Sequence, residues 1–228
     1  MEPGDILAST WTLYRTHWAH LVTIAAVVYV PLGAVAALLA LGGWAGAVAA
    51  NLLNVAAIFC VQGALVKAVE DVRDGRPDLT VSETYGYVGA RLGTLALAGV
   101  LATLGIAAGL ALLVVPGLLL LTWWLVLSPV IMLESRGTLD AFGRSRALAM
   151  RSPWPVFGVA ILTLIVLLGF TALLTLAVRP VSDVAGAFIL AAVGNSLAAP
   201  FAAVAWTLTY FALRRMEDGA AGAPAAPG

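Results

Sequence analysis

The sequence LGTLALAGVLATLGIAAGLALLVVPGLLLLTWWLVLSPVIML, from Leu92 to Leu133, contains no charged side chain. A helix that crosses the hydrocarbon core of a bilayer needs about 20 mostly apolar residues, so this stretch has the length of two such helices. Pro116-Gly117 lies between the halves and favours a turn, because proline lacks a backbone N–H and glycine tolerates positive φ. The stretch therefore predicts two membrane-spanning helices, Leu92–Val115 and Leu118–Leu133.

The composition of the whole chain is typical of a membrane protein. Of its 228 residues, 62% are hydrophobic and only 11% are charged, whereas soluble domains carry roughly 25% charged residues. The mean hydropathy is +1.01. Such a chain has too few polar side chains to cover the surface of a soluble protein. The formal net charge is zero, which provides no general attraction to nucleic acid.

Further apolar runs bring the expected number of membrane-spanning helices to six. Pro31, Pro129 and Pro200 fall within the first, fourth and sixth, where each removes a backbone hydrogen bond and permits a kink. We expect an all-α chain with one transmembrane domain over residues 1–218, and a disordered Ala/Gly/Pro tail over 219–228. The remaining expected spans are Leu21–Leu41, Ala45–Val66, Val156–Val178 and Val184–Leu213.

The basic residues are distributed unequally between the two expected sides of the membrane. If the N-terminus is cytoplasmic, every lysine and arginine except Arg179 lies on the cytoplasmic side, as the positive-inside rule requires. Lys67 is the only lysine among the 12 basic residues, and this bias, with the many alanines, is typical of a GC-rich bacterial genome. The expected location is therefore the bacterial plasma (inner) membrane, with both termini cytoplasmic.

The six spans form three successive hairpins, each of which follows a short amphipathic segment. Lys67 precedes Glu70 at the end of the first hairpin as Arg214 precedes Glu217 at the end of the last, and the middle hairpin ends at Glu134. This pattern predicts a threefold repeat of one cytoplasmic interfacial helix and one hairpin. The amphipathic segments are Asp5–Trp18, Thr80–Arg91 and Thr138–Arg151.

The segment Thr138–Arg151 is the best candidate for an interfacial helix. Asp140, Arg144 and Arg151 share one helical face, and the acid precedes Arg144 by one turn, which favours an ion pair. The segment either anchors and orients the fifth span or binds a phospholipid or a partner protein with its arginines. Its predicted apolar face contains Leu139, Phe142, Ala149 and Met150. The candidate residues for contact with a lipid or partner are Arg15, Lys67, Arg144, Arg146, Arg151 and Arg214.

Polar side chains form a stripe on the second expected span. Asn51, Asn54 and Gln62 share one face there, and Asn195 and Ser196 of the sixth span are their expected partners. Polar groups are costly in hydrocarbon without partners, so these side chains should face the interior of the bundle. They either line a polar cavity or join helices by hydrogen bonds.

Sequence motifs of enzymes are absent. There is no phosphate-binding GxxxxGK[ST], no GxSxG and no acidic pair within an apolar run. His17 and His20 are the only histidines and Cys60 the only cysteine, too few for a zinc site with roughly three or four protein ligands. We therefore expect no catalytic site, no metal and no cofactor.

Short motifs along most of the chain point to a known family. They are Gly4–Leu7, Leu13–Arg15, Pro116-Gly117, Ser128-Pro129, Glu134, Ala141–Leu148 and Trp154–Gly158. With them the sequence resembles the bacterial glycerophosphoryl diester phosphodiesterase membrane domain family, in which a helix beginning at Pro-Gly ends at an acidic residue before an amphipathic helix. Gly143, Pro153 and Pro155 depart from this pattern. The resemblance implies a membrane-embedded accessory module, because the soluble catalytic barrel has no counterpart here.

Two main functions remain open on these grounds, and a membrane-embedded enzyme that acts on lipid substrates is a third, less favoured one. The first is a non-enzymatic accessory protein that binds membrane lipids, a protein partner or a second copy of itself. The alternative is a small transporter or permease subunit with a polar cavity near Asn51, Asn54 and Gln62. The two differ in whether a water-accessible cavity reaches the stripe on the second span.

Overall fold

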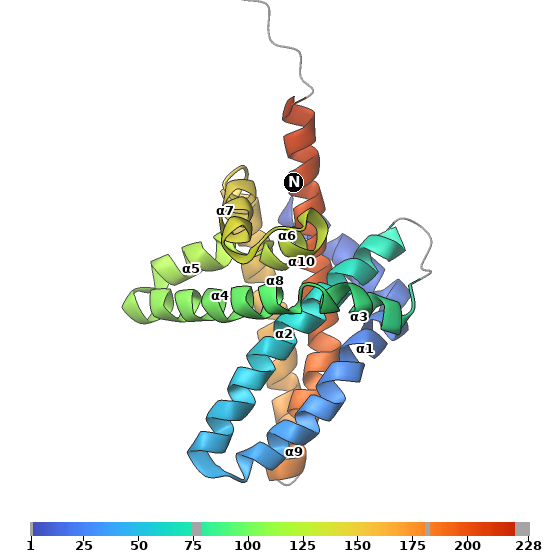
Figure 1. Ribbon diagram of the computed structural model, residues 1–228, viewed down its shortest axis with the longest axis vertical. Helices are drawn as coiled ribbons and strands as arrows, with labels where there is room; N and C mark the ends of the chain where they lie inside the picture. Colours follow the sequence, from blue (N-terminus) through green and yellow to red (C-terminus); the bar gives the residue numbers. More distant parts are fainter. Residues whose placement is uncertain (1, 74–78, 181–182, 222–228) are drawn as a thin grey trace, which may run out of the picture.

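The computed structural model describes residues 2–73, 79–180 and 183–221, and in these ranges the chain is helical without a β-strand (Figure 1). The helices, in chain order, are α1 (Pro3–Ala40), α2 (Gly43–Arg73), α3 (Val81–Gly89), α4 (Leu92–Leu112), α5 (Val114–Trp123), α6 (Leu127–Glu134), α7 (Thr138–Ala149), α8 (Pro153–Val178), α9 (Asp183–Ile189), the π-helical turn η1 (Leu190–Gly194) and α10 (Asn195–Ala221).

Six stretches of helix among the described residues are long and apolar enough to cross a membrane. They are formed by α1, α2, α4, α5 with α6, α8, and the last part of η1 with α10. The prediction of an all-helical chain with six such stretches is confirmed. The turn between α1 and α2 lies at Leu41-Gly42, and α2 begins at Gly43, whose φ of +69° is readily available only to glycine.

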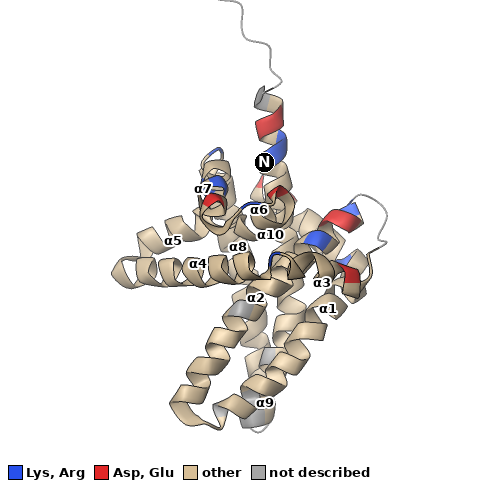
Figure 2. Cartoon of the chain, in the orientation of Figure 1, with Lys and Arg blue, Asp and Glu red and all other residues tan. Residues whose placement is uncertain are grey.

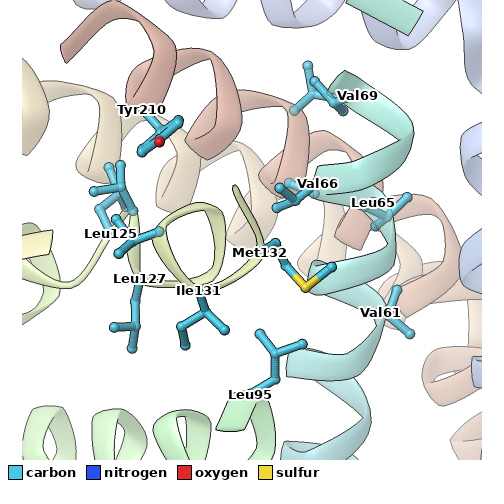
Figure 3. Packing of buried hydrophobic residues seen from close by; sticks show 14 of the residues in the cluster. Val61, Leu65, Val66, Val69, Leu95, Leu125, Leu127, Ile131, Met132 and Tyr210 are labelled. Carbon is cyan, nitrogen blue, oxygen red and sulfur yellow. The ribbon is translucent and has the colours of Figure 1, made fainter. Parts of the chain in front are cut away.

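The hydrophobic core includes residues of α1, α2, α3, α4, α6, α7, α8 and α10, and one part of it lies where α2, α4 and α6 meet. Leu95 of α4 lies close to Ile131 and Met132 of α6, beside α2 (Figure 3). Gly63 of α2 permits this approach, because a Cβ atom there would lie 2.6 Å from Leu95 Cδ1. Small residues at helix crossings allow the same close packing in membrane bundles generally.

The hairpin of α4 and α5 runs across the direction of the α1–α2 hairpin (Figure 1). Its turn lies at Leu113, which is extended (φ −160°, ψ 144°), three residues before the predicted turn. Pro116 is instead in the first turn of α5, where a backbone N–H is not needed. A Cβ atom on Gly109 would lie 2.9 Å from Gly117 Cα, so the two glycines let the helices touch. The prediction of a turn at Pro116-Gly117 is therefore wrong by one helical turn.

The fourth expected span is not one continuous helix. α5 ends at Trp123 and α6 begins at Leu127, with a turn between them. Pro129 falls in the first turn of α6, so its missing N–H breaks no bond within that helix. The kink expected at Pro129 is instead a break in the helix before it.

The first helix also contains an irregular turn. α1 bends at His17 (φ −115°, ψ 20°), near the end of the expected amphipathic segment, while Pro31 lies inside the helix. A Cβ atom on Gly33 would lie 3.1 Å from Ala192 Cβ, so α1 packs closely on η1.

α10 continues to Ala221, so the first residues of the expected disordered tail are helical. Residues 222–228 of that tail lie outside the described residues.

Charged side chains gather at one end of the molecule, here called the charged end, which contains the end of α2, α3, α7 and the C-terminal turns of α10 (Figure 2). The long shafts of α1 after Arg15 and of α2 before Lys67 carry no charge. Arg76, another of the basic residues predicted to be cytoplasmic, lies outside the described residues. α3 and α7 are separate short helices within the expected amphipathic segments.

Candidate functional site

Three helices bring acidic and basic side chains into contact at the charged end. Glu134 is the last residue of α6, Arg144 lies in α7, and Glu217 lies near the end of α10. Arg144 bonds both carboxylates. The group is here called the arginine cluster, and it consists of Glu134, Arg136, Arg144, Arg151, Tyr210, Arg214 and Glu217.

Arg144 uses all three nitrogens of its guanidinium group. Nε donates to the two carboxylate oxygens of Glu134 at 3.1 and 2.9 Å, and Nη1 and Nη2 donate to those of Glu217 at 2.9 and 2.6 Å. The side chains of Arg144, Glu134 and Glu217 are only 16%, 10% and 21% exposed, so water screens the pairs weakly. The hydrogen bonds to Glu217, and then those to Glu134, raise the pKa of Arg144 against the opposing effect of burial. Arg144 is thus a fixed positive link between α6 and α10.

The other members of the cluster surround this link. They contribute three further arginines and one tyrosine, so four arginines face two carboxylates, a net charge of +2. The excess charge lies on the outer arginines, which are partly exposed. Their contacts are Tyr210 Oη to Glu134 (3.2 Å), Arg136 to Glu134 (3.3 Å), Arg151 to Glu217 (3.0 Å), and Arg214 to Glu134 and Glu217 (3.3 and 3.6 Å).

Hydrogen bonds to the ends of α5 and α6 hold the cluster in place. Ser135 ends α6 with a left-handed φ of 58°, and Arg91 donates to its hydroxyl at 2.6 Å and to the carbonyl of Ile131 at 2.8 Å. A guanidinium group there satisfies the last carbonyls of the helix and complements its partial negative charge. Ser145 of α7 is buried and donates to the carbonyl of Trp123, the last residue of α5, at 2.8 Å. α7 is therefore fixed to the break between α5 and α6.

The structure corrects one expectation about α7. Arg144 pairs with Glu134 and Glu217, and Asp140 forms no ion pair with it. The long-range carboxylates are preferred because they meet the guanidinium group in a partly buried, bidentate geometry. On the predicted apolar face Leu139 and Met150 are exposed and Ala149 is buried; Ala141, Ser145 and Leu148 are the other buried residues of α7.

An apolar groove of about 460 Å³ opens between α5 and α8. Met150 and Pro153 line it at the loop that joins α7 to α8, and the exposed Arg151 stands between these two residues in the chain. The guanidinium carbon of Arg146 lies 4.5 Å from the ring centre of Trp123, which also lines the groove. The groove therefore has an apolar wall and basic groups near one end. Its other lining residues are Val115, Leu118, Leu119, Thr122, Trp154 and Phe157.

The remaining basic candidates lie away from this groove. Lys67 forms an ion pair with Glu70, and its Nζ lies 5.1 Å from the ring centre of Tyr87. Arg15 is exposed on α1. Arg214 lies 3.6 Å from Glu217, so the two similarly spaced basic–acidic pairs of the sequence each form an ion pair. The structure thus brings together Arg144, Arg151 and Arg214, and sets Arg146 on the neighbouring Trp123.

The polar residues of the predicted stripe on α2 lie in different environments. Asn51 is exposed and donates to the carbonyl of Ala47 in its own helix, so the prediction that it faces the interior is wrong. Asn54 is half-buried and Gln62 is buried, and Gln62 Oε1 has no hydrogen-bond partner among the described residues. Burial rises along the helix because only the half of α2 near the charged end packs against α4 and α6.

The expected partners on the last span do not bond this stripe. Ser196 is buried and donates to the carbonyl of Ala192 at 2.5 Å, within its own stretch of helix. Asn195 is half-buried at the start of α10. No hydrogen bond joins either residue to α2 in the described part of the chain.

Sequence reasoning did not single out four members of the arginine cluster, Glu134, Arg136, Tyr210 and Glu217, as site residues. Glu134 and Glu217 were visible as acids that end apolar runs, but nothing in the sequence pairs them with Arg144. Tyr210 lies inside an apolar run and gives no sequence signal. The partners come from helices far apart in the chain, so only the tertiary fold reveals the cluster.

In the described ranges no group of three His, Cys, Asp or Glu side chains is arranged to hold a metal ion. Comparison with known proteins adds no further assignment: no family model, no curated protein and no solved structure matches the chain. The resemblance to the glycerophosphoryl diester phosphodiesterase membrane domain family stays a prediction from short motifs.

Proposed function

We propose that the protein is a non-enzymatic, multi-pass protein of a bacterial plasma membrane that binds an anionic phospholipid of the inner leaflet. The observation that carries the proposal is the placement of the exposed Arg146 and Arg151 beside the apolar groove between α5 and α8. A phospholipid has matching parts, because its phosphate pairs with guanidinium groups and an acyl chain fits an apolar groove. An accessory role in the membrane is consistent with the resemblance to the phosphodiesterase membrane domain family.

The charged end is proposed to face the cytoplasm. It carries the described lysine and arginine side chains other than Arg179, and such residues favour the cytoplasmic side. The N-terminal part of α1 up to His17, together with α3 and α7, is proposed to lie in the membrane interface. α4 and α5 form a hairpin whose two ends are close to the charged end, which supports the proposal that the start of α1 and the end of α10 lie on the same side of the membrane.

The arginine cluster supports the lipid site in two ways. Each guanidinium nitrogen of Arg144 donates to Glu134 or Glu217, and these bonds fix the position of α7, so Arg144 serves as a positioning residue. Arg151 makes one contact in the cluster and is 40% exposed, which leaves donors for a phosphate oxygen. Trp154 is 80% exposed beside the groove, as tryptophans of the membrane interface are.

The experiment is a lipid titration of the detergent-purified protein followed by native mass spectrometry. Dioleoylphosphatidylglycerol and dioleoylphosphatidylcholine differ in net charge and share their acyl chains. A basic residue near an anionic surface contributes about 1 kcal/mol, so the double variant R146Q/R151Q should lose about 30-fold of its preference for the anionic lipid. Arg179→Gln, which removes an exposed arginine beyond α8, is the matched control and should keep the preference. An unchanged preference in R146Q/R151Q would overturn the proposal.

A further inference from the structure

A small cavity of about 150 Å³ lies where α2, α4, α6, α8 and α10 approach one another. No ionisable side chain lines it. Its walls are apolar apart from four side chains: Trp124 of the turn before α6, Ser128 of α6, Thr163 of α8 and Trp206 of α10. The cavity is separate from the groove beside Arg146 and Arg151, and its occupancy does not depend on the lipid site proposed there.

Two of the side chains that line the cavity each carry a buried polar atom without a partner. Neither Thr163 Oγ1 nor Trp206 Nε1 has a hydrogen bond among the described residues, and the Thr163 side chain belongs to a residue that is 1% exposed. A buried donor left unpaired costs about 1–3 kcal/mol. Native structures rarely leave such groups unpaired without an unseen partner or a function.

Thr163 and Thr207 differ from two other buried threonines in the helices, and only Thr163 of the two lines the cavity. Thr122 and Thr209 each donate to the carbonyl four residues earlier in the same helix, at 2.8 and 2.7 Å. Thr163 could form the same bond with Val159 and does not, so its hydroxyl hydrogen remains available to the cavity. The indole N–H of Trp206 is a donor only. The cavity therefore offers hydrogen-bond donors and calls for an acceptor.

We infer that this cavity binds a neutral oxygen acceptor, which receives hydrogen bonds from Thr163 Oγ1 and Trp206 Nε1. The acceptor is neutral because no charged group lines the cavity to balance an ion. Two sources share this chemistry: water, about five molecules of which would fill the volume at roughly 30 Å³ each, and the ester carbonyl of a lipid acyl chain. Either one supplies the partners that the protein lacks at this point in the bundle.

The test uses Thr163→Val, which keeps the side-chain shape and removes the hydroxyl. If an acceptor is bound, the variant loses a hydrogen bond and its Tm should fall by about 2–4 °C. If the cavity is empty, the variant loses only an unpaired donor and its Tm should stay equal or rise, which would overturn the inference. Thr209→Val is the matched control, because Thr209 is buried and bonds within its own helix.

A second variant and a change of lipid complete the test. Trp206→Phe removes the other donor, and its effect on Tm should be coupled to that of Thr163→Val, because both donors bind one occupant. Additive effects would contradict a shared occupant. The measurements are made in detergent alone, with dioleoylphosphatidylglycerol, and with its diether analogue, which lacks the ester carbonyls. A loss of Tm in all three identifies water, and a loss only with the diester lipid identifies the carbonyl.

Discussion

Buried polar groups have partners within the protein at the charged end and lack them in the small cavity lined by Thr163 and Trp206, here called the central cavity. At the charged end, Arg144 donates to four carboxylate oxygens of Glu134 and Glu217 and has no nitrogen left without an acceptor. In the cavity, Thr163 Oγ1 and Trp206 Nε1 have no acceptor in the described part of the chain. The nitrogens of Arg144 thus find their acceptors within the protein, whereas the donors of the cavity need an acceptor from a bound molecule.

The difference separates positioning from binding. A polar group whose hydrogen bonds are all made by the protein holds helices together and is poorly placed to recognise a ligand. Groups with free donors, such as Arg146 and Arg151 at the charged end and Thr163 in the cavity, can bind one. The number of partners that a polar side chain already has therefore predicts what its substitution will do.

The largest effect is expected for Arg144→Gln. The substitution leaves Glu134 and Glu217 mostly buried without their shared partner, so the free energy of unfolding should fall by about 3 kcal/mol, as when other buried ion pairs lose one member. Arg144→Lys should lose less, because lysine keeps the charge but lacks the planar fork. The measurement is reversible unfolding in mixed micelles.

A control for this prediction lies within the same cluster. Arg136 is 46% exposed and makes a single contact of 3.3 Å with Glu134. Exposed ion pairs contribute about 0–1 kcal/mol, so Arg136→Gln should have a correspondingly small effect on unfolding. If Arg144→Gln and Arg136→Gln lowered the free energy of unfolding equally, the buried ion pairs of Arg144 would contribute no more to stability than the exposed pair of Arg136.

A smaller loss is expected for Ser145→Ala. The buried hydroxyl of Ser145 donates to the carbonyl of Trp123, and its removal leaves that carbonyl unpaired at the end of α5. The expected loss is about 1.5 kcal/mol. Thr16→Ala is the control, because the Thr16 hydroxyl is exposed and donates within its own helix, to Thr12. If the free energy of unfolding fell equally in both variants, the hydrogen bond from Ser145 would not be what fixes α7.

Much of the fold follows from the sequence, because a spanning helix needs only length and apolar composition. The stretch from Leu92 to Leu133 predicts two helices on these grounds, and it contains both α4 and the pair α5 and α6. Its interruption between Trp123 and Leu127 falls just before Pro129, whose ring and missing N–H disfavour a continuous helix there, so the sequence indicates the break. The bond from Ser145 of α7 to the carbonyl of Trp123 joins distant segments and is not visible in the local sequence.

The candidate site is less visible in the sequence than the fold. The arginines of the amphipathic segment could be predicted as site residues from their spacing alone, but the partner of Arg144 could not. The local pattern favours Asp140, one helical turn away, while the structure pairs Arg144 with Glu217, 73 positions further along the chain. A close bidentate pair outweighs a surface pair that contributes only about 0.2–0.5 kcal/mol.

The smallest effect has the opposite sign and concerns Gln62. Its Oε1 is buried and has no partner among the described residues, and it does not line the central cavity. Gln62→Leu should therefore raise the free energy of unfolding by about 1 kcal/mol, because it removes an unpaired polar group at similar volume. Thr207→Val should change stability in the same direction, since Thr207 Oγ1 is also buried without a partner. If Gln62→Leu instead destabilises the protein, Gln62 has a partner in the membrane, and a polar cavity or a helix–helix bond at this position returns as the better interpretation. The sign of this one measurement thus distinguishes a packing residue from a site.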